Sequence, residues 1–199
     1  TKKLMVSHIL GGKISNIVLA SASPRRAQLL RQIGLEFQIL PSQINEPSIG
    51  SQPVDTTKHI AYEKAKAVVD QVESGLIIGA DTTVVMDQEA FGKPSSCQQA
   101  VEFLKKLSGN LHHVITGVAL IDLNRKTEVV WSETTSVFFR RLRSEEIKAY
   151  VASGEANDKA GAYGIQGKAA AFVERIEGCY FNVVGLPLAS LTEKLYQIR

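Results

Sequence analysis

Serine and arginine side chains gather just after a short apolar segment near the N-terminus, where they have the chemistry of an anion site. The stretch 17–34 reads IVLASASPRRAQLLRQIG. It predicts a buried strand, a small-residue turn and then a helix capped by Ser23, with proline at the first helical position. The turn would aim free backbone N–H groups at a point that Ser21, Arg25 and Arg26 surround, an arrangement suited to a phosphate. A capped helix with two solvated arginines has the same local signature.

An acidic residue interrupts an otherwise apolar strand farther along the chain. Residues 76–86 read LIIGADTTVVM, with Asp81 in the middle. A buried carboxylate needs a partner, a metal or a shifted pKa, and aspartate is disfavoured inside strands. Capping of local backbone N–H groups is the alternative, but the isoleucines and valines on both sides favour a functional carboxylate. A second acid, Glu46, lies in the polar loop after a predicted strand over 35–40.

Two lysines have settings that suit a negatively charged ligand. A helical pattern over 56–72, with Asp55 as its expected cap, has Lys64 within the apolar stripe. Such a lysine must either reach the rim of the core or meet a negative partner. Lys93 is presented by the turn GKP.

A glycine-punctuated segment, 158–167, reads DKAGAYGIQG and has an apolar centre. This composition is typical of a shaped loop rather than a flexible linker. Its Gln166 offers a donor and acceptors that suit the edge of a nucleobase, or else it bonds the neighbouring backbone.

Strand and helix patterns alternate along the rest of the chain, with two long strands joined by a turn. Within the first of them His113 and Thr116 are candidates to face a cleft, although the pair His112–His113 is typical of a surface. The pattern contains no repeat or composition break, which predicts one domain with a mixed-sheet α/β fold. The expected elements are a helix over 96–107, strands over 112–123 and 127–139, a helix over 144–153, a closing hairpin over 171–185 and a helix over 187–197.

Composition excludes several classes of protein. The chain has 199 residues, 44% of them hydrophobic, and a net charge of +3, which is too weak a positive charge to indicate nucleic-acid binding. Cys97 and Cys179 lie far apart, without a CxxC pair, and are expected to be free thiols in a reducing compartment. No apolar run approaches the roughly 20 residues that span a bilayer. We therefore expect a cytoplasmic protein without membrane or nucleic-acid partners.

Seven motifs occur in the order of one known family: SASPRR, AYEKA, GADT, GKP, SGNLHHVITGVAL, DKAGAYGIQG and NVVGLP. Together they resemble the Maf family of nucleoside triphosphate pyrophosphatases. The resemblance covers residues 17–199 as a single domain and leaves 1–16 as an N-terminal extension. It implies an elongated α/β fold like that of the inosine triphosphate pyrophosphatases, with a mixed sheet and flanking helices in two lobes around a cleft. It also implies a divalent cation, magnesium or manganese, and a homodimer.

The resemblance assigns roles residue by residue. Asp81 is similar to the family's catalytic carboxylate, which activates water and holds the metal together with an acid at the position of Glu46. The residues similar to the family's triphosphate-binding set are Ser21, Arg26, Lys64 and Lys93. Those at the positions that separate its subgroups are Arg25, Thr82 and Gln166.

The types at these subgroup positions are those of the members that hydrolyse dTTP and UTP. The implied reaction releases the nucleoside monophosphate and pyrophosphate, in the service of nucleotide-pool housecleaning that extends to modified pyrimidine nucleotides. Alternatives are a pyrophosphatase for 7-methyl-GTP or a non-standard purine triphosphate, and a non-catalytic regulator of cell division.

Overall fold

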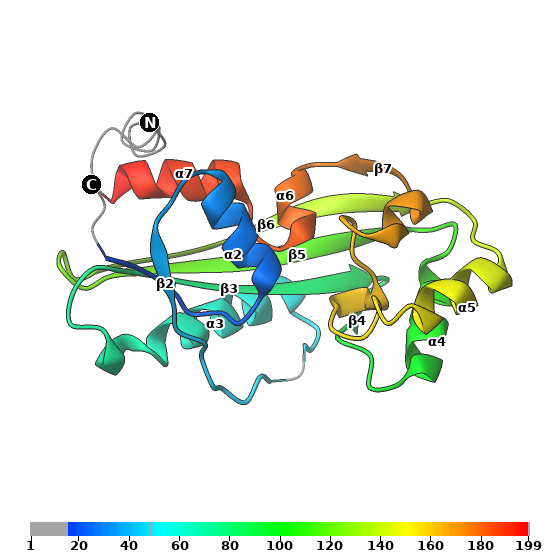
Figure 1. Cartoon of the computed structure of the whole chain (residues 1–199), viewed down its shortest axis with the longest axis horizontal. Coiled ribbons are helices and arrows are strands. Elements are labelled where there is room, and N and C mark those ends of the chain that lie inside the picture. The colour runs from blue at the N-terminus through cyan, green and yellow to red at the C-terminus, as the bar shows by residue number, and fades with distance from the viewer. Residues whose placement is uncertain (1–15, 48, 199) are drawn as a thin grey trace.

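The computed structural model describes residues 16–47 and 49–198 (Figure 1). The expected N-terminal extension therefore lies outside the described residues except for Asn16. The carbonyl of Asn16 accepts a hydrogen bond of 3.0 Å from the backbone N–H of Leu76. Among the described residues, no helix is both long enough and apolar enough to cross a membrane.

One mixed sheet of seven strands organises the described part of the chain. Its order is β2-β1-β3-β5-β6-β7, with β4 paired to β3. β1 is parallel to β2 and β3, whereas the other pairs are antiparallel, so the predicted mixed-sheet α/β fold is confirmed. The strands are β1 (Ile17–Leu19), β2 (Phe37–Ile39), β3 (Leu76–Met86), β4 (Glu89–Phe91), β5 (Leu111–Asp122), β6 (Thr127–Phe139) and β7 (Val173–Glu177).

The three long strands β3, β5 and β6 lie along the long axis of the elongated molecule and connect its two lobes (Figure 1). In the first lobe, α2 (Pro24–Gln32) and α7 (Leu188–Gln197) cover one face of the sheet, and α3 (Pro53–Lys66) covers the other. In the second lobe, α4 (Cys97–Leu107) and α5 (Ser144–Ala152) pack on the far part of the long strands. Short 3₁₀ turns follow at Val69–Gln71, Ala160–Ala162 and Lys168–Phe172.

The first strand–turn–helix unit forms as its sequence predicts. Pro24 begins α2, and the Ser23 hydroxyl accepts a hydrogen bond of 3.5 Å from the backbone N–H of Arg26. Gly34 ends the unit with a φ of 78°, a conformation that glycine adopts without the steric cost of a side chain. The predicted cap and stop are confirmed.

Helix α3 begins earlier than expected, and Asp55 is not its cap. Gln52 is the N-cap and Pro53 takes the first position, where a missing N–H costs nothing, while Asp55 lies in the first turn beside the positive end of the helix dipole. The helix lies against bare backbone of the sheet. A Cβ at Gly79 would be 2.2 Å from the Ala61 carbonyl oxygen, so only glycine allows this approach.

The expected closing hairpin over 171–185 is wrong in its second half. Strand β7 pairs with β6, but a turn at Gly178 (φ 125°) leads into a short helix, α6 (Tyr180–Val184). Asn182 explains the change, because its buried side-chain amide donates to the Val114 carbonyl at 3.0 Å and to the Thr135 hydroxyl at 2.9 Å. Those bonds hold the segment over the sheet as a helix.

His112 is buried, contrary to the surface expectation for the histidine pair, while His113 is exposed. The ring of His112 packs edge-on against Phe139 and Tyr163, and its Nε2 lies 2.8 Å from the Tyr163 hydroxyl. Side chains alternate across a strand, so one histidine of the pair joins the core of the second lobe while its neighbour faces solvent.

Candidate active site

A gap in the pairing of β3 lies beside a large cavity. β5 lies along one edge of β3, whereas the other edge is shared by β1, which pairs with Leu76–Ile78, and β4, which pairs with Val84–Met86. Among the described strands, none pairs with residues 79–83 on that edge. A cavity of about 820 Å³ opens beside this segment, with Asp81, Thr82 and Thr83 in its lining.

Every residue to which the family resemblance assigns a role lines this one cavity, whereas the cleft candidates His113 and Thr116 are not in its lining. They come from the start of α2, the loop after β2, α3, β3, the turn after β4 and the loop over 158–167. The set is Ser21, Arg25, Arg26, Glu46, Lys64, Asp81, Thr82, Lys93 and Gln166. The structure therefore brings the whole predicted site together, while the role of each member stays a prediction.

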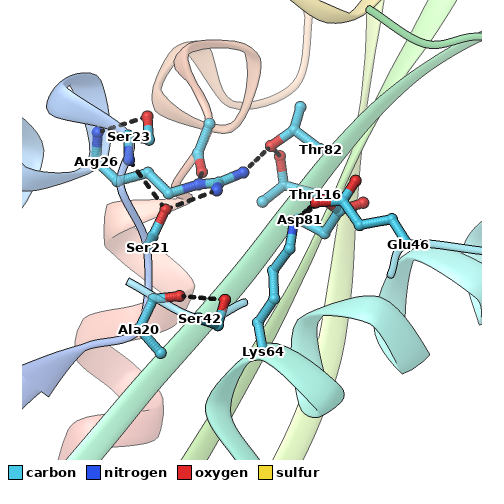
Figure 2. A network of polar contacts seen from close by, with 11 residues as sticks. Ala20, Ser21, Ser23, Arg26, Ser42, Glu46, Lys64, Asp81, Thr82 and Thr116 are labelled. Atoms are coloured by element: carbon cyan, nitrogen blue, oxygen red, sulfur yellow. Dashed lines mark hydrogen bonds and ion pairs between the residues drawn. The ribbon is translucent and has the colours of Figure 1, made fainter. Parts of the chain in front are cut away.

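Neighbouring residues of β3 serve opposite faces of the sheet. Asp81 faces α3 and accepts a hydrogen bond from Lys64, whereas Thr82 faces α2 and accepts one from Arg26 (Figure 2). Because side chains alternate along a strand, a free strand edge presents both at once. The cavity thus collects cations from helices on both sides of the sheet.

Arg26 is a buried cation whose hydrogen bonds all go to neutral groups. Its guanidinium donates to the Ser21 hydroxyl at 3.1 Å, the Thr82 hydroxyl at 3.0 Å and the Gly185 carbonyl at 2.9 Å (Figure 2). Burial lowers the pKa of Arg26, and the negative charge of Asp81 in the same cavity opposes this shift. Among the described residues, no carboxylate hydrogen-bonds to this guanidinium, so its charge is placed to attract an anion from the cavity.

Lys64 joins two carboxylates. Its Nζ lies 2.6 Å from Oδ1 of Asp81 and 2.7 Å from Oε1 of Glu46 (Figure 2). The sequence predicted that Lys64 either reaches the rim of the core or meets a negative partner, and the structure shows the negative partner. Burial alone would raise the pKa of Glu46, but the hydrogen bond and charge of Lys64 outweigh it and lower that pKa below its usual range.

The carboxylates of Asp81 and Glu46 fit a divalent cation whose remaining coordination positions are filled by a bound ligand and water. Carboxylate oxygens are the donors that magnesium and manganese prefer. Among the described residues, no group of three or more histidine, cysteine, aspartate or glutamate side chains is placed to hold a metal ion. Magnesium commonly binds through one or two carboxylates, with phosphate oxygens and water for the rest. Asp81 and Glu46 match that pattern.

The loop over 158–167 is shaped, as its composition predicts. Gly161 and Ala162 have positive φ angles of 67° and 60°, and the Gly164 N–H donates to the Tyr150 hydroxyl at 3.2 Å. The hydrogen bond between His112 of β5 and Tyr163 anchors the centre of the loop to the sheet. These anchors hold the exposed Gln166 at the wall of the cavity.

Comparison with known proteins agrees with the geometry. The family described as Maf-like protein matches residues 16–198. The chain belongs to the Maf-like protein family.

Three similar relatives of this Maf-like chain share one activity in their names. A dTTP/UTP pyrophosphatase of Ruminiclostridium cellulolyticum is 51% identical over 185 residues, which cover 92% of this chain and 96% of the relative. Proteins of the same name from Geobacter sp. strain M21 and Geobacter metallireducens are 51% and 53% identical, over 92% and 91% of this chain and 95% of each relative. The solved structure of the Staphylococcus aureus Ham1 protein matches with a TM-score of 0.53 at 14% identity, covering 93% of this chain and all of that one, which confirms the fold.

Sequence reasoning missed several groups of the Maf-like site. The Gly185 carbonyl that holds Arg26 and the Ser42 hydroxyl, which donates to the Ala20 carbonyl at 3.3 Å, have no local signal (Figure 2). Thr116, a candidate to face a cleft, does not line the cavity: its hydroxyl is buried and lies 3.0 Å from that of Thr82. Asp158 was given no role but lines the cavity, and its place in the DKAGAYGIQG motif is the signal that could have found it.

Proposed function

We propose that this Maf-like protein hydrolyses dTTP and UTP to the nucleoside monophosphate and pyrophosphate. One observation supports this most: a buried arginine with neutral partners and a lysine-bound pair of acids line the same cavity. A polyanion would pair with the charge of the arginine, and the two acids would hold a divalent cation. The names of the relatives supply the substrate class.

The triphosphate binds across the free edge of β3. Ser21 and Arg26 bind it from the side of α2, where the start of the helix adds its positive dipole end. Lys64 and the exposed Lys93 add positive charge from the other side. Charge-assisted hydrogen bonds of this kind are the strong ones, and they stabilise the pyrophosphate as negative charge builds on it.

Asp81 and Glu46 would hold the magnesium or manganese ion. When bound, such an ion lowers the pKa of a water molecule and neutralises charge on the phosphates.

Asp81 acts as the general base of the reaction. Its carboxylate accepts a proton from water as the water oxygen bonds to the α-phosphorus, and the bond from that phosphorus to the α–β bridging oxygen breaks. Lys64 orients the carboxylate through the bond at Oδ1. The electron pair of the broken bond leaves with pyrophosphate.

The nucleobase of the substrate is selected by Arg25, Thr82 and Gln166. The side-chain amide of Gln166 matches the carbonyl and ring N–H of thymine or uracil, and a site that hydrogen-bonds its substrate rejects bases that leave these groups unpaired. Thr82 acts through its neighbour, since its hydroxyl accepts from Arg26 and so affects where the phosphates lie.

A triphosphate panel with pyrophosphate detection tests the function. With magnesium or manganese, dTTP and UTP should be the best substrates among canonical nucleotides and 7-methyl-GTP. Asp81→Asn should abolish release while the far-UV circular dichroism stays native, and Asp55→Asn, in an exposed ion pair outside the cavity, should match the wild type. Wild-type turnover by Asp81→Asn would remove Asp81 from its role, and nucleotide binding without turnover by the wild type would favour a regulator.

The same proposal includes a homodimer in a reducing, cytoplasmic setting. Cys97 and Cys179 are free thiols in the structure. Light scattering on the purified chain measures the assembly, and a monomer at micromolar concentration would contradict the dimer.

A further inference from the structure

Asp158 lies between two basic side chains at the cavity. Its Oδ2 accepts a hydrogen bond of 3.0 Å from Nη1 of Arg25, and its Oδ1 accepts one of 2.6 Å from Nζ of Lys159. Arg25 stands in the first turn of α2, and 133 residues separate it from Asp158. This ion pair is therefore a tertiary contact and not a local cap.

The pair connects the two lobes. Helix α2 packs in the first lobe with Leu29 and Leu30. The loop that Asp158 begins packs in the second lobe through Ala162 and Tyr163, and it returns to the core of the first lobe at Ile165. The same loop carries Gln166. A bond from Arg25 to Asp158 thus adds to the packing of Ile165 in setting how far the start of α2 lies from the side chain expected to read the nucleobase.

Asp158 has no part in the bonds that hold the other two acids of the cavity. Glu46 and Asp81 both bond Lys64, whereas Asp158 bonds Arg25 and Lys159. A carboxylate repels a bound triphosphate, so it weakens affinity unless it serves another purpose. Holding two cations in place is such a purpose.

Further hydrogen bonds anchor the loop on the Asp158 side. Lys159 Nζ also donates to the Glu155 carbonyl at 2.6 Å, and the Glu155 carboxylate accepts from the Lys168 N–H at 2.9 Å. Partial burial alone would raise the pKa of Asp158, but the bonds from Lys159 and Arg25 outweigh it and lower that pKa to about 2. Asp158 therefore stays charged throughout the pH range in which the protein would work.

We propose that Asp158 is a positioning residue that sets nucleotide selectivity: through its ion pair with Arg25 it fixes the distance between α2 and the loop of Gln166, and so restricts the base subsite to a pyrimidine. The inference rests on the proposed function. This positioning role predicts two effects that a purely structural role of Asp158 does not predict. Without the negative charge, triphosphates in general bind more tightly, while the preference for a pyrimidine falls.

The test compares dTTP with dGTP, which differ only in the base. In Asp158→Asn the ratio of kcat/KM for dTTP to that for dGTP should fall about threefold to fivefold, the range that a partly exposed ion pair can supply. KM for dGTP should fall rather than rise. Asp55→Asn is the matched control, because Asp55 is 66% exposed in an ion pair with Lys58 and Asp158 is 60% exposed in its own. The control should keep the wild-type ratio.

A double-mutant cycle assigns the effect to the pair. If Asp158 acts through Arg25, then Asp158→Asn should change the ratio little when Arg25→Met is already present. An unchanged ratio in Asp158→Asn, or equal losses for both nucleotides through a higher KM, would overturn the proposal. So would full additivity in the cycle.

Binding keeps this result separate from the activity itself. Analogues of dTTP and dGTP with a methylene group between the α and β phosphorus atoms are bound without turnover, so calorimetry reads selectivity directly. If the wild type binds but does not cleave, the proposed function fails while the cycle on affinities still decides the role of Asp158. If the ratio of the affinities for the dTTP and dGTP analogues is the same in the wild type and in Asp158→Asn, the proposed role of Asp158 is wrong.

Discussion

Lys64 and Asp81 form an ion pair in which Nζ and Oδ1 lie 2.6 Å apart and both side chains are 11% exposed. The lysine comes from the inner face of α3 and the acid from the middle of β3. Glu46 shares the same ammonium group at 2.7 Å. One cation therefore balances two carboxylates in a largely buried setting, so its removal changes both the ligand site and the stability of the fold.

Lys64→Met should abolish most activity and destabilise the protein. Two acids lose their cation, and breaking a buried ion pair costs about 3 kcal/mol when water cannot reach it, so about 1–3 kcal/mol is expected beside this open cavity. Urea unfolding and pyrophosphate release measure the two effects. Lys66→Met, an exposed position on the same helix, is the control. Adding Asp81→Asn to Lys64→Met should recover part of the lost stability, and a further loss of similar size would contradict the charge argument.

Arg26→Lys should raise KM for the triphosphate about tenfold to a hundredfold with a smaller effect on kcat. The guanidinium meets Ser21, Thr82 and Gly185 in three directions at once, and the single ammonium group of lysine cannot reproduce that fork. Steady-state kinetics with dTTP give the split between KM and kcat. Arg31→Lys on the same helix, whose guanidinium lies over the Phe37 ring, should leave both parameters near wild type. An unchanged KM in Arg26→Lys would show that the charge alone suffices.

The sequence was informative wherever one short segment determines the outcome. Ser23, Pro24 and Gly34 specify the start and end of α2 through capping and backbone preference, and the apolar strand around Asp81 places a carboxylate inside the fold. The position of Lys64 within an apolar stripe predicted that it needs a negative partner or the rim.

The rest depends on contacts between distant segments. The bond from Arg26 to the Gly185 carbonyl spans 159 residues, and the gap on β3 exists only because β1 and β4 share one edge. Burial of His112 likewise requires Tyr163, which no strand pattern places beside it. The local sequence pattern also gave a wrong prediction for the start of α3, because Pro53 begins this helix ahead of the predicted cap Asp55.

Gly79→Ala should displace α3 and impair the site without touching it. The added methyl would lie 2.2 Å from the Ala61 carbonyl oxygen and 2.8 Å from the Ala65 backbone nitrogen, so the helix that carries Lys64 must move. Overpacking against backbone costs about 2–3 kcal/mol or more. Urea unfolding and KM should both show the change. Gly50→Ala is the control, because no atom of the described residues, apart from its chain neighbours, lies within 4 Å of a Cβ there. Wild-type stability in Gly79→Ala would contradict the close packing of α3.

The buried His112 should make the protein less stable as the pH falls below 7. Burial, helped by the nearby His113, lowers the pKa of His112 from 6.5 to about 4. Between these two values the unfolded chain binds a proton that the folded chain does not, so stability decreases as the pH decreases. From pH 7 to pH 5 the free energy of unfolding should drop by about 2 kcal/mol from this group.

Urea unfolding at pH 7 and pH 5 measures that drop, and neighbouring variants isolate its source. His112→Gln, whose amide keeps a hydrogen-bonding group near the Tyr163 hydroxyl, should lose most of the pH dependence. His113→Gln removes the exposed neighbour on the same strand and should retain it. Tyr163→Phe leaves the imidazole buried and should also retain a large part, because burial rather than the hydrogen bond is the main cause of the shift. The same pH dependence in His112→Gln and wild type would assign the effect to carboxylates elsewhere in the fold.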